Sequence, residues 1–439
     1  MAGKISAAES EPFSIEINDP KGTTPGGDPF LDRSVGRLRI TVDGLVISST
    51  KSDKGDSRED LTIPLYDFAE WITSNWWAIL YEPKKRDEEN IDDDYTFRHW
   101  IGAARSGFAL PDLSIDPQGE LVELSARSTY LRSARLTFTE GAETLVGRTV
   151  VEEQLSKVAD FVVDRLRGQQ TPVHEQWALI KATTNEEKVY CRLIGSLGLS
   201  PYDDNPEVTK VLQQLTSAEL ASTILEDLFQ AADTLSLRKL AGLTTEASNY
   251  LRHSRQLDVS ALDQMELPSD TSPWAWKRGK DATEIVRQFL GVAATDSDGA
   301  DKLFTMLGLD SAIASGSSID EDTSLSGLLD REQTEMKVAL IDKSEAHRRF
   351  AAARAAYLAW ASGRFSKRLL TSAVTRDQQA SRAFAAELLA PFAYIKARGS
   401  QSMLSLNQVQ KIAAELRVSP QVVRYQAKNN GMKVVDMVM

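Results

Sequence analysis

The sequence predicts an α+β protein in which a β-rich N-terminal domain is followed by a helical middle and a mixed C-terminal domain. Three observations support this prediction. Apolar residues alternate through much of residues 31–143, as in strands that bury one face. Their spacing becomes helical from Thr149 to His253. Further along, a β-like segment at 336–341 comes before an alanine-rich helix at 348–360.

Length and composition limit the class of protein. At 439 residues the chain is long enough for two to four domains, and 42% hydrophobic with 26% charged residues is typical of globular proteins. Cys191 is the single cysteine, so no internal disulfide is expected. No window reaches the roughly 18 apolar residues of a membrane helix, and the opening segment lacks a signal-peptide core. We therefore expect a cytoplasmic protein of bacterial type with no membrane partner.

Charge is distributed unevenly along the chain, whose formal net charge is −12. From Asp342 onward there are 16 Lys and Arg against 6 Asp and Glu, which leaves 35 against 57 upstream. Two interpretations remain open. Either a basic domain docks on an acidic one within the chain, or the C-terminal part offers a surface to a nucleic acid or another acidic partner.

The first domain is expected at residues 31–148, after a loosely ordered arm at 1–30. The stretch "NDPKGTTPGGDP" indicates the arm. Asp43-Gly44 stands between two alternating apolar runs and indicates a hairpin. A Trp-rich helix is predicted within "DFAEWITSNWWAIL", because five apolar residues follow helical spacing: Phe68, Trp71, Ile72, Trp76 and Ile79.

Three further regions follow. A helical domain is expected at 149–256 and carries no catalytic spacing. The domain at 257–400 opens with the linker-like "DVSALDQMELPSDTSP" and continues with a helix, "WAWKRGKDATEIVRQFLGV". A helix-turn-helix-like subdomain is expected at 401–439.

The usual sequence signatures of catalysis and metal binding are missing. None of the four histidines has a second histidine or a cysteine at a metal-ligand spacing, and His174-Glu175 is followed by Ala178 where a zinc motif needs histidine. Local signatures of serine hydrolases, P-loops and dinucleotide sites do not occur. The acidic runs "NIDDDY" and "SIDEDTS" lack EF-hand spacing and are interpreted as solvated loops. We therefore expect no metal and no cofactor.

The second half of the chain contains four segments in succession: "MKVALI", "HRRFAAARAAYLAW", "RDQQASRAFAAELLAP" and "LSLNQVQKIAAELRVSPQVVRYQAKNNG". This succession resembles the ImmA/IrrE family of bacterial metallopeptidase-like proteins over about residues 270–431. The segment "FAAELLAP" in this place is fairly specific. The residues that match are Arg349, Phe350, Ala353, Phe384, Ala385, Ala386, Glu387, Leu388, Leu389, Pro391, Val418, Ser419 and Val423.

The sequence differs from the family at the positions that bind zinc and activate water. An H-E-x-x-H helix supplies two zinc ligands and a glutamate that takes a proton from bound water. Here the two histidine positions fall on Arg354 and Leu358, and the glutamate position falls on Ala355. The guanidinium of Arg354 would also repel a cation, because it stays charged at any working pH.

The family's third metal ligand falls on Ala380, and a slip of one or two residues would place it on Gln379 or Gln378, which are not carboxylates. The resemblance thus implies a degenerate zincin-like domain that is catalytically inactive and holds no metal. It further implies a regulatory or protein-interaction role with another protein as partner. The implied setting is a bacterial phage-defence, mobile-element or stress-response system.

The last two predicted helices have the spacing of a helix-turn-helix. Ser405 and Ser419 stand at expected N-caps, Pro420 at a first helical position and Gly431 at the end. The alternative function is therefore a DNA-binding transcriptional regulator. Nucleic acid is not the favoured partner, because in the family that the sequence resembles this pair usually packs beside the peptidase core as part of one domain. The side chains offered to DNA would be Gln421, Arg424, Gln426, Lys428 and Asn429.

Overall fold

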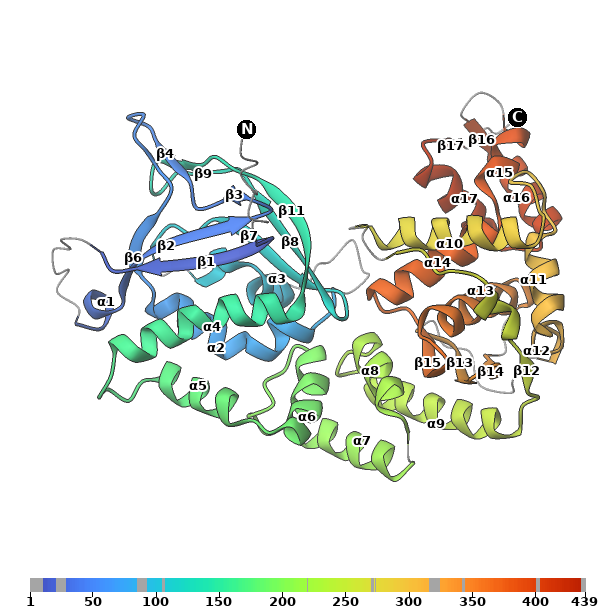
Figure 1. Cartoon of the computed structure of the whole chain (residues 1–439), viewed down its shortest axis with the longest axis horizontal. Coiled ribbons are helices and arrows are strands. Elements are labelled where there is room, and N and C mark those ends of the chain that lie inside the picture. Colours follow the sequence, from blue (N-terminus) through green and yellow to red (C-terminus); the bar gives the residue numbers. More distant parts are fainter. Residues whose placement is uncertain are drawn as a thin grey trace, which may run out of the picture. The chain divides into compact units, whose positions relative to one another are not determined.

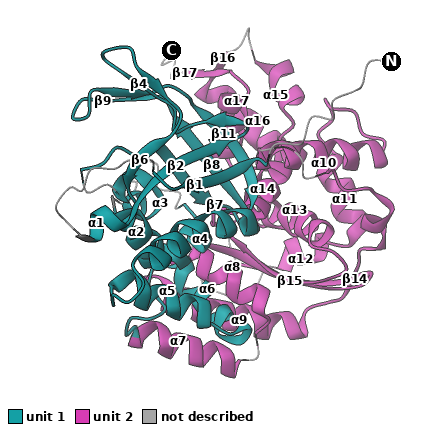
Figure 2. Ribbon diagram, turned by 60° about the vertical axis from the view of Figure 1, so that its left-hand side comes forward, with its two compact units in different colours: residues 1–205 teal, residues 206–439 magenta. Residues whose placement is uncertain are grey.

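The chain forms two compact units, residues 1–205 and 206–439, which Figure 2 colours separately. Each unit combines helices with antiparallel strands, so the predicted α+β class is confirmed. The computed structural model describes residues 11–20, 29–84, 93–104, 107–218, 220–269, 272, 274–315, 324–341, 344–399 and 403–435.

Unit 1 is built on three small antiparallel sheets (Figure 1). Their strands are β1 (Phe13–Asn18), β2 (Val35–Val42), β3 (Leu45–Val46) and β6 (Leu61–Pro64), then β4 (Thr50–Ser52), β5 (Ser57–Arg58), β9 (Thr129–Leu131) and β10 (Leu136–Phe138), then β7 (Asp112–Pro117), β8 (Leu121–Arg127) and β11 (Ala142–Gly147). The predicted hairpin joins β2 and β3, and Asp43 and Gly44 have positive φ angles of 49° and 76°, as a tight two-residue turn requires.

The predicted Trp-rich helix is α2, and its five apolar residues named above are all buried in unit 1. Three later helices, α4, α5 and α6, pack against α2. The helices of the unit are α1 (Pro29–Arg33), α2 (Tyr66–Tyr81), α3 (Asp93–His99), the 3-10 helix η1 (Ile101–Ala104), α4 (Arg148–Arg165), α5 (Pro172–Ala182) and α6 (Asn185–Ser196).

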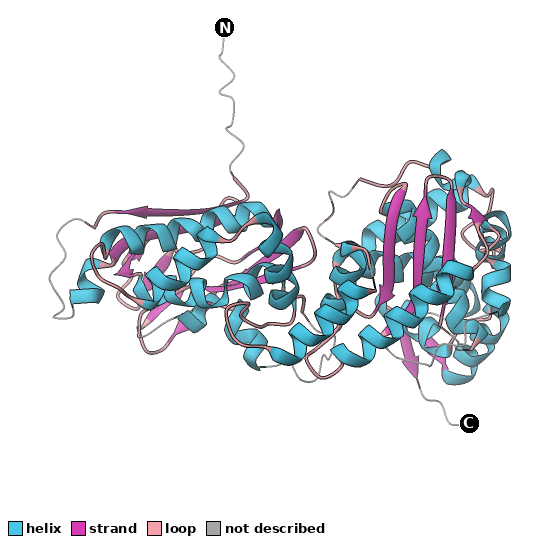
Figure 3. Ribbon diagram, turned by 90° about the horizontal axis from the view of Figure 1, so that it is seen from below, coloured by secondary structure: helices cyan, strands magenta, loops and turns pink. Residues whose placement is uncertain are grey.

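Unit 2 is centred on an antiparallel sheet of order β12-β14-β13-β15, whose long strands lie side by side in Figure 3. Its strands are β12 (Leu257–Asp258), β13 (Leu325–Glu332), β14 (Glu335–Leu340) and β15 (Phe365–Thr371). The elements around it are α7 (Pro206–Ser217), α8 (Ser222–Ala231), α9 (Leu237–His253), η2 (Ser260–Gln264), α10 (Ala275–Phe289), α11 (Gly299–Leu307), α12 (Asp310–Ser315), α13 (Glu345–Ala361), α14 (Arg376–Leu389), α15 (Phe392–Arg398), α16 (Leu406–Leu416) and α17 (Pro420–Asn429), with the parallel pair β16 (Met403–Ser405) and β17 (Lys433–Val435).

The predicted helical domain at 149–256 is divided between the units. Trp177 and Cys191, from its first part, belong to the core of unit 1. Helices α8 and α9, from its second part, pack on β15 and β13 of unit 2. The predicted subdomain at 401–439 likewise shares its core with the rest of unit 2. These boundaries differ from the predicted ones for a physical reason. The periodicity of an amphipathic helix shows that one face is buried, but it does not specify the sheet against which that face packs.

Two stretches expected to be irregular form structure. Residues 13–18, within the predicted arm, pair with β2 along six residues and bury Phe13 and Ile15. The linker-like segment contains η2, and Leu262 and Met265 are buried. The remainder of the arm at 1–10 and 21–28, most of "SIDEDTS" and the start of "NIDDDY" lie outside the described residues.

Candidate functional site

Helix α13 lies at the centre of unit 2. It packs against β13 on one side and α14 on another, and every residue from Ala351 to Trp360 is buried. Alanine allows this, because its small side chain lets sheet and helices approach closely. The predicted buried helix is therefore present, and its residue 354 faces other polar groups in the interior.

Arg354 is held by three hydrogen bonds in the core of unit 2. Its Nη2 donates to the Thr371 carbonyl oxygen at 2.7 Å and to Gln378 Oε1 at 2.5 Å. Its Nε donates to Ser381 Oγ at 3.2 Å. The side chain is only 3% exposed. A buried guanidinium is costly unless its donors are used, so these bonds are needed to keep Arg354 inside.

Gln378 extends this network towards α8. Its Nε2 donates to the Leu369 carbonyl oxygen at 2.7 Å and lies 3.4 Å from Asp227 Oδ1. Asp227 is buried and accepts two hydrogen bonds from Arg368, at 2.8 and 3.0 Å, and one from the Leu369 amide. Burial alone would lower the pKa of Arg368, but Asp227 and Asp377 raise it above its usual value. The network thus joins α13, α14, β15 and α8.

The other three zinc-chemistry positions are apolar and enclosed. Ala355, Leu358 and Ala380 are each fully buried in the core of unit 2. Helix α10 crosses α14 at Ala380, where a Cβ on Gly279 would lie 2.2 Å from the Ala380 carbonyl oxygen. The α14 residues that meet Arg354 are therefore Ser381 and Gln378, and Gln378 is the position reached by a slip of two residues. Gln379 instead donates to the Val374 carbonyl oxygen.

Asp227 was not identified from the sequence. It lies more than a hundred residues before Arg354, with no motif around it. No group of three or more His, Cys, Asp or Glu side chains that could hold a metal ion occurs in the described parts of the chain.

A second buried polar cluster, in unit 1, was also missed. Glu82 is 1% exposed and accepts two hydrogen bonds of 2.7 Å from Arg98. His99 places Nε2 3.2 Å from Glu82 Oε2 and Nδ1 2.7 Å from the Ile115 carbonyl oxygen, while the Tyr95 ring stacks on it. Burial raises the pKa of Glu82, but the hydrogen bonds from His99 and Arg98 lower it below its usual value overall.

The helix pair forms as predicted. Ser405 caps α16 in a capping box with Gln408, and Arg417 at its end has a left-handed φ of 54°. Ser419 stands at the N-cap of α17, but its side chain makes no capping hydrogen bond, which corrects the expectation for this residue. Gly431 follows α17 with a positive φ of 80°.

Four of the five side chains expected to face DNA are exposed on α17: Gln421, Arg424, Lys428 and Asn429. The fifth expectation is wrong. Gln426 is buried, and its Nε2 donates to Glu387 Oε2 at 2.8 Å and to the Ala390 carbonyl oxygen at 3.1 Å. Together with Val423 and Ala427 it lies on the face of α17 that packs on the domain.

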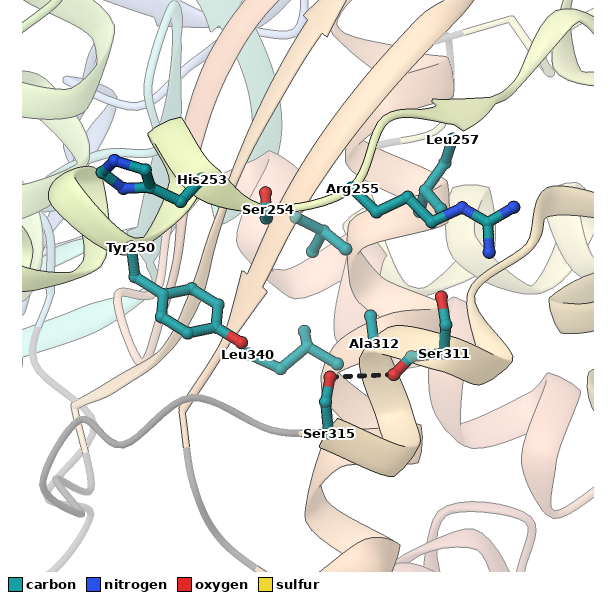
Figure 4. Close-up of a pocket in the computed structure, with 10 residues that line it drawn as sticks. Tyr250, His253, Ser254, Arg255, Leu257, Ser311, Ala312, Ser315 and Leu340 are labelled. Atoms are coloured by element: carbon teal, nitrogen blue, oxygen red, sulfur yellow. Dashed lines mark hydrogen bonds between the residues drawn. The ribbon is translucent and has the colours of Figure 1, made fainter.

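Unit 2 also contains a cavity of about 240 Å³ between α9, α12 and β14 (Figure 4). Leu257, Val338 and Leu340 provide apolar walls, and polar groups at its edge include Tyr250 and Arg255. None of the site residues expected from the sequence lines it.

Among the described residues, no helix combines the length and apolar character that crossing a membrane requires. Comparison with known proteins found no matching family model, no matching curated protein and no matching solved structure.

Proposed function

We propose that the chain is a catalytically inactive metallopeptidase-like protein that acts as a regulatory or protein-interaction component. The observation that supports this best is the buried hydrogen bonding of Arg354, at the place of the first zinc histidine in the family that the sequence resembles. A cation fixed there competes with a metal ion by charge and by volume. Ala355 offers no proton acceptor, and Leu358 offers no ligand atom.

The zincin-like fold of residues 257–400 is part of this proposal. The proposed partner is another protein, held on the surface that a peptidase would use for its substrate. A bacterial phage-defence, mobile-element or stress-response system is the proposed setting.

Metal analysis of the purified chain tests the proposal. We expect far less than one zinc ion per chain and no chelator-sensitive proteolysis, because no residue at these positions can activate water. Stoichiometric zinc that depends on the region around Arg354, or cleavage that a chelator abolishes, would contradict the proposal.

Restoring the zinc residues makes the test sharper. Arg354→His, Ala355→Glu and Leu358→His are combined either with Gln378→Glu or with Ala380→Glu. We expect only the Gln378→Glu set to bind zinc, because Gln378 meets residue 354 whereas Ala380 lies against α10. Zinc bound only by the Ala380→Glu set would mean that the third ligand position is Ala380, as in the alignment without a slip, and that Gln378 does not occupy it.

The second candidate is a DNA-binding regulator that uses α17. The exposure of Gln421, Arg424, Lys428 and Asn429 favours it. A single helix-turn-helix normally needs a dimer to bind an operator tightly. Gel-shift assays with duplex DNA, and with Arg424→Glu/Lys428→Glu as the impaired variant, test this function.

A further inference from the structure

Helices α10 and α17 of unit 2 both carry aromatic and basic side chains, and one hydrogen bond joins α10 to the end of α17. Lys280 Nζ, in α10, donates a hydrogen bond of 2.9 Å to Asn430 Oδ1, directly after α17. The same amine lies 5.3 Å from the centre of the Trp276 ring, one turn earlier in α10. We refer to these residues and the outer face of α17 as the α10–α17 surface: Trp276, Lys280, Arg424, Tyr425, Lys428 and Asn430.

Two rings of this surface are open to stacking. Trp276 is 49% exposed and Tyr425 is 51% exposed. Tyr425 lies between Arg424 and Lys428 along α17, and its hydroxyl accepts a hydrogen bond from Gln421 that fixes the ring along the helix. Flat aromatic faces next to cations are the elements by which proteins hold unpaired bases.

The charge around these rings suits phosphates. From Val418 to Val435 the chain contains three Lys and Arg and no Asp or Glu, whereas Arg417, directly before, is paired with Asp301 at 2.6 Å. Arg424 and Lys428 lie one turn apart and are both exposed. This local charge contrasts with the formal net charge of −12 for the chain.

We infer that the α10–α17 surface binds single-stranded nucleic acid, with bases stacked on Trp276 and Tyr425. Arg424, Lys428 and Lys280 lie beside the phosphates. Duplex DNA keeps its bases stacked inside and is read by polar side chains in its grooves, so it would leave both rings unused. The inference involves none of the residues around Arg354 and stands whether or not the proposed loss of peptidase activity is correct.

Fluorescence anisotropy of the full chain with a labelled thymidine oligonucleotide of about 20 bases, and with a duplex of equal length, tests the inference. We expect tighter binding of the single strand, with affinity falling as salt rises from 50 to 200 mM. Trp276→Ala and Tyr425→Ala should each weaken binding on the order of tenfold, because each variant removes one aromatic ring on which a base stacks. Arg424→Glu/Lys428→Glu should make binding less sensitive to salt. The slope of the logarithm of the binding constant against the logarithm of the salt concentration should become shallower by about 0.7 for each phosphate that the variant no longer neutralises.

Matched controls are available elsewhere in the chain. Phe365→Ala removes an aromatic ring that is 72% exposed on β15, and Lys51→Glu/Lys54→Glu reverses two exposed charges in unit 1. Both should bind like the unmodified chain, and all variants should unfold at its melting temperature. The inference is overturned by an absence of binding at 50 mM salt, by a preference for the duplex, or by unchanged affinity of both aromatic variants.

Discussion

At the scale of single residues, Arg354 shows how a charged side chain can be kept in an apolar interior. Its donors reach a backbone carbonyl, an amide oxygen and a hydroxyl, so the charge is solvated by the protein itself. Gln378 is equally constrained, because its amide both accepts from Arg354 and donates to Leu369. Each residue thus holds the other in position.

Arg354→Ala should lower the free energy of unfolding by about 2–4 kcal/mol, because three buried hydrogen bonds are removed and a cavity remains. Arg354→Met keeps most of the volume and should cost less. Urea unfolding measures both, with the exposed Arg424→Ala as a control that should change stability by no more than about 0.5 kcal/mol. Equal stability of Arg354→Ala and the unmodified chain would show that the network contributes nothing.

Glu82 predicts a pH dependence for unit 1. Its pKa is lower in the folded chain than the usual value, so its contribution to stability is full above the pH at which an unfolded glutamate titrates, about 4.3, and is lost as pH falls below it. Urea unfolding followed by tryptophan fluorescence between pH 7 and 3 should show this loss. Glu82→Gln should be less stable at pH 7 and less sensitive to acid, whereas Glu153→Gln, at an exposed position of α4, should behave like the unmodified chain.

At the scale of elements, close helix crossings fix the surroundings of α13. Helix α10 approaches α14 so closely that only glycine fits at position 279, with Ala380, Ala383 and Phe384 against it. Thr283, one turn later, donates to the Phe384 carbonyl oxygen at 3.3 Å and continues the contact. Because Ala380 lies against α10, the α14 residues Gln378 and Ser381 face α13, where they contact Arg354.

Gly279→Ala should destabilise the protein by about 1–3 kcal/mol, because the added methyl group would overlap the Ala380 backbone. Gly242→Ala is the matched control, since Gly242 lies within α9 with no atom within 4 Å of an added Cβ. That change should stabilise by about 0.5–1 kcal/mol through helix propensity alone. Thermal or urea unfolding compares the two, and effects of the same sign would refute the close crossing.

At the scale of the whole molecule, each unit has a hydrophobic core of its own. One core extends from Phe13 to Cys191, and the other extends from Leu257 to Met432. Helix α8 adds Asp227 to unit 2, where it pairs with Arg368 at 2.8 Å. The fold of unit 2 therefore includes residues that precede its core in the sequence.

The fragment 206–439 should unfold cooperatively, because it keeps α8 and α9 over β15 and β13. The fragment 257–439, cut where the sequence predicted a domain boundary, should be less stable or aggregate, because Arg368 loses its buried partner and apolar surface is exposed. Circular dichroism during heating measures both. If the shorter fragment were as stable as the longer one, α8 and α9 would be dispensable for unit 2.

The sequence by itself determined the local elements: the Asp43-Gly44 hairpin, the buried helices α2 and α13, and the pair α16 and α17 with its exposed Arg424 and Lys428. These follow from turn chemistry and periodicity, which act between near neighbours in the chain.

Only the tertiary structure decided that Gln378 and Ser381 meet Arg354, that Asp227 joins this network, and that Gln426 faces inward. It also decided that the first helices of residues 149–256 join the core of unit 1, whereas α8 and α9 pack on the sheet of unit 2. The physical reason is that such contacts depend on the angle and position at which packed elements cross. For elements far apart in the chain, the spacing of residues along the sequence does not specify that crossing.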